Sequence, residues 1–140
     1  MTLDEIRDMW REDCVIDQND LDTENFKCTV IHEKYLSIWS QFKLMLSDAE
    51  TKGKMLYKAK FEYYSGKAPA KVYADKPFNH KVLKGDLTTY IWADDEWLRN
   101  KQKIDYLETC INYLEMILKQ LSSRGFQIKN FIDLRKTGDY

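Results

Sequence analysis

A regular spacing of apolar residues in the first half of the chain constrains the fold more than any other feature. Apolar side chains recur there at alternating intervals of four and three residues, with one polar interruption, at Ile31, Tyr35, Ile38, Phe42, Met45, Ala49, Lys52, Leu56, Ala59 and Tyr63. Such heptad-like spacing lies on one face of an α-helix. The sequence therefore predicts helix over residues 22–65, either as one piece or with a break near residues 47–53, where a helix-start pattern precedes Gly53.

Patterns at the ends of this segment and before it place further boundaries. Thr2-Leu3-Asp4-Glu5 has the form of a capping box and predicts a short helix to about Asp13. Gly66 suits the left-handed position that ends a helix. Residues 67–93, which hold both prolines, are expected to form a connecting loop, with a short β-hairpin near residues 80–92 as the alternative.

A second long helix is expected after Asp94 or Asp95, either of which suits its N-cap. Its apolar stripe consists of Trp97, Ile104, Leu107, Ile111, Leu114, Leu118 and Leu121, with Asn100 as one polar member. A second stripe beside it widens the apolar arc to roughly 160° at ~100° per residue, which indicates burial against several neighbours. Arg124-Gly125 is expected to stop this helix, and the apolar residues after it predict a last helix that folds back as a hairpin. The fold class is thus mainly α.

Charge is distributed unevenly along the chain although the net charge is only −1. Residues 1–50 carry a net charge of −7, whereas residues 52–84 carry nine lysines against two acidic residues. The middle of the chain is therefore basic in the way of a module that binds polyanions. The acidic first third is expected to be a solvated face, with contact to a basic partner or a neighbouring subunit as the alternative.

The segment from Gly53 to Gly66 is both basic and aromatic. On a helix with Leu56, Ala59 and Tyr63 towards the core, the opposite side carries Lys54, Tyr57, Lys58, Phe61 and Tyr64, with Lys60 on its shoulder. Bases of single-stranded nucleic acid stack on such rings, and lysines neutralise phosphates. The alternative is that the aromatic side chains pack against another helix or subunit.

Other sites are weakly indicated. Ser65-Gly66-Lys67 lacks the remainder of a phosphate-binding loop, and three separate cysteines indicate thiols in a reducing cytoplasm. Asp94-Asp95-Glu96 is expected to cap a helix rather than bind metal for a nuclease. The sequence predicts no catalytic residue, metal or cofactor, no secretion signal and no membrane span.

Two blocks of sequence resemble the UvsY-type recombination mediators of tailed phages. Leu56-Tyr57-Lys58-Ala59-Lys60-Phe61-Glu62-Tyr63-Tyr64-Ser65-Gly66-Lys67 resembles a signature of that family, and Ser123-Arg124-Gly125-Phe126-Gln127-Ile128-Lys129-Asn130 resembles its C-terminal block. The chain departs from the family at Lys60, where arginine is expected, and in the loop after Gly66, which is rich in Ala, Pro and Lys instead of acidic residues and Gly.

The resemblance implies a non-enzymatic protein of homologous recombination in the host cell cytoplasm. Its implied partners are single-stranded DNA, a UvsX-type recombinase, the single-strand-binding protein and copies of itself in a ring of about six or seven subunits. It carries over Lys58 and Lys60 as DNA contacts. The helix geometry adds Lys54, Tyr57, Phe61 and Tyr64, and the basic run adds Lys67 directly after the helix.

The implied organisation has three parts. Residues 1–66 hold the acidic helix and the DNA-contact helix, residues 67–93 connect, and residues 94–140 oligomerise. The expected oligomerisation residues are Ile104, Leu107, Ile111, Leu114, Leu118, Leu121, Phe126, Ile128 and Phe131. The competing hypothesis is a helical oligomeric adaptor whose basic face docks an acidic protein.

Overall fold

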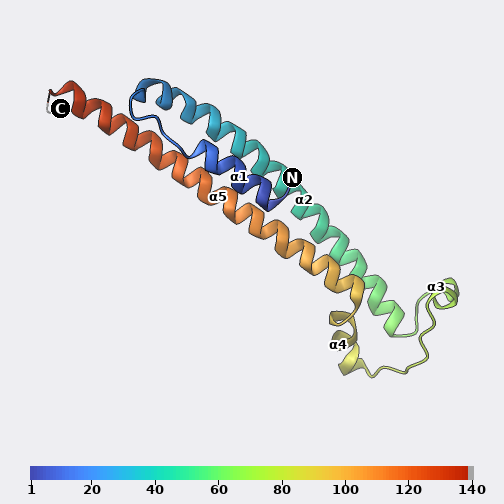
Figure 1. The fold of residues 1–140 in the computed structure, drawn as a ribbon. Coiled ribbons are helices and arrows are strands. Elements are labelled where there is room, and N and C mark those ends of the chain that lie inside the picture. Colours follow the sequence, from blue (N-terminus) through green and yellow to red (C-terminus); the bar gives the residue numbers. More distant parts are fainter. Residues whose placement is uncertain (139–140) are drawn as a thin grey trace. The chain divides into compact units, whose positions relative to one another are not determined.

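The protein is mainly α, as the sequence predicts. In the computed structural model, which describes residues 1–138, the elements are α1 (Leu3–Asp13), α2 (Leu21–Tyr64), α3 (Ala70–Asp75), the 3-10 turn η1 (Lys84–Asp86), α4 (Leu87–Trp92) and α5 (Asp95–Lys136) (Figure 1). These elements form two compact units. Unit 1 combines Met1–Lys43 with the chain from Glu108 on, and unit 2 is Leu44–Leu107, so α2 and α5 contribute to both.

The core of unit 1 is built from three helices. The capping box of α1 is confirmed, because Glu5 N–H donates to Thr2 Oγ1 and Thr2 N–H donates to Glu5 Oε2. Ile6 of α1 is fully buried together with Tyr35 of α2 and Leu114 of α5. Burial against two neighbours explains why the apolar arc of α5 is wider than a two-helix seam needs.

The predicted end of a helix at Arg124-Gly125 is wrong, and so is the C-terminal hairpin, because α5 continues without interruption to Lys136. Arg124 is buried inside unit 1 rather than placed at a turn. Its guanidinium donates to the carbonyl oxygens of Asp13 (2.8 Å) and Val15 (3.0 Å) and lies 3.6 Å from the Glu24 carboxylate. The residue therefore binds the end of α1 and the start of the following connection to α5.

Helix α2 is a single helix, so the alternative of a break at residues 47–53 is also wrong. Gly53 lies inside α2 because the helices of unit 2 approach closely there: a Cβ atom at this position would lie 2.6 Å from Asn100 Oδ1. Asn100 Nδ2 in turn donates to the carbonyl of Ala49 (3.2 Å). Gly53, at the break that was the alternative for α2, and Asn100, the polar member of the α5 stripe, thus face each other across α2 and α5.

The buried face of α2 departs from the predicted stripe after Phe42. Leu46, Gly53 and Lys60 face inwards, whereas their predicted counterparts, Met45, Lys52 and Ala59, are exposed. After Phe42, Ala49 and Leu56, the next inward-facing residue thus lies four positions further along the chain instead of the predicted three. This difference turns the centre of the buried face of α2 by about 50° at ~100° per residue. This rotation changes which side chains of residues 53–66 are free.

The connection between α2 and α5 is helical or irregular throughout the described chain. Gly66 has the predicted left-handed conformation, with φ of +79°. The β-hairpin alternative near residues 80–92 is wrong, because η1 and α4 occupy residues 84–92. Leu87 and Ile91, four residues apart, are both buried, and this spacing belongs to a helix. Within residues 1–138, no helix has a stretch long and apolar enough to cross a bilayer.

Candidate nucleic-acid interface

The outward side of α2 in unit 2 carries two lysines and one aromatic ring. Lys54, Lys58 and Phe61, spaced four and three residues apart, share this side of the helix, and we call them the α2 face. The side chain of Lys58 is 81% exposed, and its nearest carboxylate, that of Glu62, is 4.0 Å away. Lys54 makes no ion pair with any residue of the described chain. Phe61 is 41% exposed.

Two of the predicted contact residues lie beside this face and not on it. Tyr57 packs edge-on against Trp97, with ring centroids 5.6 Å apart. Tyr64 packs against Phe78 and Tyr90 and donates its hydroxyl to Asp94 Oδ2 at 2.7 Å. The expectation that both rings are free is therefore wrong, and the rotation of the buried face of α2 is the reason. Lys67, immediately after the helix, is exposed as expected.

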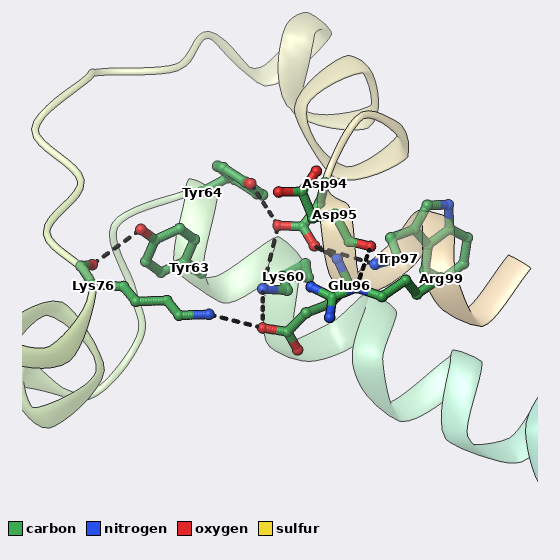
Figure 2. A network of polar contacts seen from close by, with 9 residues as sticks. All are labelled: Lys60, Tyr63, Tyr64, Lys76, Asp94, Asp95, Glu96, Trp97 and Arg99. Carbon is green, nitrogen blue, oxygen red and sulfur yellow. Dashed lines mark hydrogen bonds and ion pairs between the residues drawn. The ribbon is translucent and has the colours of Figure 1, made fainter.

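Lys60 lies in a network of opposite charges (Figure 2). Its ammonium nitrogen is 3.2 Å from Asp94 Oδ2 and 3.3 Å from Glu96 Oε1, and its side chain is only 13% exposed. Lys76 approaches the same Glu96 oxygen at 3.1 Å from the other side (Figure 2). We call Lys60, Lys76, Asp94 and Glu96 the ion-pair cluster. It joins α2, the connection after α3 and the start of α5 within unit 2.

The cluster shifts the pKa of Asp94, Glu96 and Lys76 in the directions that favour their charged forms. Burial raises the pKa of the Asp94 carboxyl, but hydrogen bonds from Tyr64, the Trp97 N–H and Lys60 outweigh it, so the pKa lies below its ordinary 3.8. Hydrogen bonds from Lys76 and Lys60 lower the pKa of Glu96 below 4.5. The hydrogen bond to Glu96 raises the pKa of Lys76. Beside the cluster, burial and, to a lesser extent, the hydrogen bond to Asp94 raise the pKa of the Tyr64 hydroxyl, which keeps this group neutral.

Asp94 also caps α5, as the sequence predicts. Its Oδ1 atom accepts hydrogen bonds from the backbone N–H groups of Glu96 (2.9 Å) and Trp97 (3.2 Å). One carboxylate therefore satisfies the helix start with one oxygen and holds Lys60 and Tyr64 with the other. Among residues 1–138 no three His, Cys, Asp or Glu side chains are grouped so that they could hold a metal ion.

The residues predicted to oligomerise fall into two classes. Most of them lie inside the protomer, and these buried or half-buried positions are Ile104, Leu107, Ile111, Leu114, Leu118, Leu121 and Ile128. Phe126 and Phe131 are instead 72% and 56% exposed on α5. The exposed phenylalanines are thus the members of the set that are free to meet another chain.

Sequence reasoning missed the partners of Lys60 and the position of Arg124. One signal was available for the first: after the basic residues 52–84, Asp94, Asp95 and Glu96 form the nearest cluster of acidic residues, with only Asp86 before it. No comparable signal marks Arg124, because the Arg-Gly pair also has the form of a helix end.

Comparison with known proteins identifies the family of the chain and its fold. Residues 9–138 match the family model described as recombination, repair and ssDNA binding protein UvsY. The recombination protein uvsY of Enterobacteria phage T4 is 26% identical over 135 residues, which cover 96% of each chain. Crystal structures of the bacteriophage T4 recombination mediator protein UvsY superpose with TM-scores of 0.88 and 0.83 at 25% and 24% identity, covering at least 99% of each chain. The chain belongs to the UvsY family of recombination, repair and single-stranded-DNA-binding proteins.

Proposed function

We propose that this protein is a recombination mediator that binds single-stranded DNA through the α2 face. In this role it helps a UvsX-type recombinase to assemble on DNA covered by single-strand-binding protein, in the host cell cytoplasm and without catalysis of its own. Membership of the UvsY family supports the class of function. The observation that carries the site is the presence of Lys54, Lys58 and Phe61 together on one exposed side of α2.

The α2 face suits a single strand better than a duplex. Residues three and four apart on a helix are neighbours about 5–6 Å apart at Cβ, so the two lysines lie near enough to contact successive phosphates. An unstacked base adjoining them stacks on Phe61, which contributes roughly 1–3 kcal/mol. In a duplex, the bases are already stacked on one another and leave this ring without a partner.

The two lysines that the family resemblance pairs lie in different environments. Lys58 is free to contact a phosphate, whereas Lys60 has to leave Asp94 and Glu96 before it reaches one. We therefore propose that Lys58 contacts DNA and that Lys60 positions the end of α2 against the start of α5 in unit 2. Tyr57 and Tyr64 share this positioning role through Trp97 and Asp94.

Oligomerisation fits this proposal because a face with two lysines and one ring binds weakly. Several copies in a ring of about six or seven subunits raise the effective concentration of each face for one strand. Each individual contact stays weak, so the recombinase still displaces the strand. The exposed Phe126 and Phe131 are the proposed seam.

Recombinase assembly on DNA coated with single-strand-binding protein tests the proposal. Wild-type protein should shorten the lag before the recombinase filament forms, and the variant with Lys54→Gln and Lys58→Gln should not. Light scattering on both proteins checks that oligomer size is equal. Equal stimulation by wild type and variant would contradict the α2 face as the site, and no stimulation by wild type would contradict the mediator function.

The adaptor hypothesis predicts a different result. If the basic face docks an acidic protein, the affinity for oligo-dT should be low and should depend little on salt concentration. A contact between lysines and phosphates instead gives a linear fall of log K with log salt.

A further inference from the structure

The connection from α2 towards α4 is a strongly basic surface that the α2 face does not include. Residues 67–84 carry five lysines against one acidic residue, a net charge of +4. These lysines are Lys67, Lys71, Lys76, Lys81 and Lys84. All five are exposed, and of these only Lys76 forms an ion pair within the described chain. Its one acidic residue, Asp75, pairs with none of them.

Aromatic contacts give this connection a fixed course. Tyr73 stacks on Tyr63 of α2, with centroids 5.4 Å apart and planes 17° apart, and its hydroxyl donates to the Tyr63 carbonyl at 2.8 Å. Phe78 packs against Tyr63, Tyr64 and Tyr90. Tyr73 and Phe78 thus hold the connection at two points against the helices of unit 2.

The lysines are left on the outside by this arrangement. Helix α3 contributes no fully buried residue, and its half-buried Tyr73 is the side chain that stacks on α2. The hydroxyl of Tyr63 donates to the carbonyl of Lys76 at 3.0 Å, which fixes the backbone at the middle of the connection while the lysine side chains project from it. Four unpaired ammonium groups on one anchored segment repel one another, and a polyanion is the ligand that relieves this repulsion.

We propose that residues 67–84 form a second phosphate-binding surface for single-stranded DNA, with Lys71, Lys81 and Lys84 as its contacts. This surface continues the path of the strand beyond the α2 face, and it rests on the proposed function only for the identity of the polyanion. Its aromatic residues are occupied in anchoring the segment, so it contacts the sugar-phosphate backbone and does not stack bases. It therefore adds salt-dependent affinity without sequence preference.

Salt dependence of oligo-dT binding tests this surface. The variant Lys71→Gln, Lys81→Gln, Lys84→Gln removes three contacts, and each is expected to lower the slope of log K against log salt by about 0.7 for a single strand. The slope should fall by about 2 for each protomer engaged. The matched control is Lys103→Gln, Lys119→Gln, Lys129→Gln, which removes the same charge from exposed, unpaired lysines of α5 and should leave the slope near that of wild type.

The possible outcomes separate this surface from the α2 face. A reduced slope in the first triple variant, with an unchanged slope in the control, supports the second surface. The variant with Lys54→Gln and Lys58→Gln tests the α2 face separately, and an absence of effect there would contradict the α2 face but not the second surface. An unchanged slope in the first triple variant overturns the surface, and so does an equal fall in the control. Loss of binding to an acidic protein partner at an unchanged DNA slope would also overturn it. Circular dichroism should show the same helix content in every variant.

Discussion

At the scale of single residues, neighbouring lysines of one helix have opposite environments. Lys58 projects into solvent, whereas Lys60, two residues on, is held by two carboxylates. The difference follows from the helix itself, since two residues are about 200° apart around its axis. A double substitution of both lysines therefore changes a surface contact and a structural contact together, and the single variants are needed to separate them.

Lys58→Ala and Lys60→Ala should differ in stability. Lys58→Ala is expected to change the free energy of unfolding by no more than about 0.5 kcal/mol, as for other surface positions. Lys60→Ala leaves Asp94, whose side chain is 9% exposed, without its cation and should cost about 1–3 kcal/mol. Urea denaturation measures both, and equal stabilities would show that the ion pairs of Lys60 contribute nothing.

The ion-pair cluster should also make stability depend on pH in the acid range. The folded state lowers the pKa of Asp94 and Glu96, so their contribution is fully present above the ordinary values of 3.8 and 4.5 and is lost as pH falls through the lowered values. The variant with Asp94→Asn and Glu96→Gln should therefore lose less stability than wild type between pH 6 and pH 3. Thermal melts across this range provide the measurement, and parallel curves for the two proteins would exclude a role for these carboxyls.

At the scale of elements, periodicity predicted where the helices are but not how each one faces. The ranges of α1 and α2 and the cap of α5 follow from local patterns, and the structure confirms them. The rotation of the buried face after Phe42 does not follow, because Met45 and Leu46 are both apolar and packing alone selects Leu46. This choice determined which of the candidate DNA contacts were free, and it placed Lys60 inside.

The failed boundaries have a common cause in local signals that tertiary contacts override. Arg124-Gly125 has the composition of a helix end, yet Arg124 finds its partners at the end of α1, far away in sequence. Leu87 to Trp92 has β-forming composition, yet burial of Leu87 and Ile91 on one side selects a helix.

Substitution of helix glycines tests the continuity of α5. Gly125→Ala should raise the free energy of unfolding by roughly 0.5–1 kcal/mol, because alanine is the better helix former and its Cβ would meet Cys28 Sγ at an ordinary 3.9 Å. Gly53→Ala is the contrast, since its Cβ would displace Asn100 from its bond to Ala49, and we expect no gain there. Destabilisation by Gly125→Ala would favour a turn at this position after all.

At the scale of the whole molecule, the proposed mediator function relies on several copies that act on one strand. The α5 residues first expected at the seam are mostly used within unit 1, which leaves the exposed phenylalanines for assembly. Binding and assembly are thus assigned to different residues: the α2 face and the basic connection lie in unit 2, and the phenylalanines lie in unit 1.

Substitutions on α5 should separate assembly from folding. Phe126→Asp with Phe131→Asp is expected to reduce the native mass to that of a single chain and to leave helix content unchanged. Leu114→Asp, which puts a charge at a fully buried position, is expected to unfold unit 1 rather than only dissociate the oligomer. Multi-angle light scattering with circular dichroism distinguishes the two, and an intact oligomer in the double variant would exclude this seam.

The most direct test of the central claim is a titration of oligo-dT across a range of salt concentrations with two single variants of the α2 face. Phe61→Ala should weaken binding about 5- to 140-fold at every salt concentration and keep the wild-type slope, because it removes stacking only. Lys58→Gln should instead lower the slope by about 0.7 for each protomer engaged. Wild-type affinity and slope in both variants would contradict the claim that single-stranded DNA binds this face of α2.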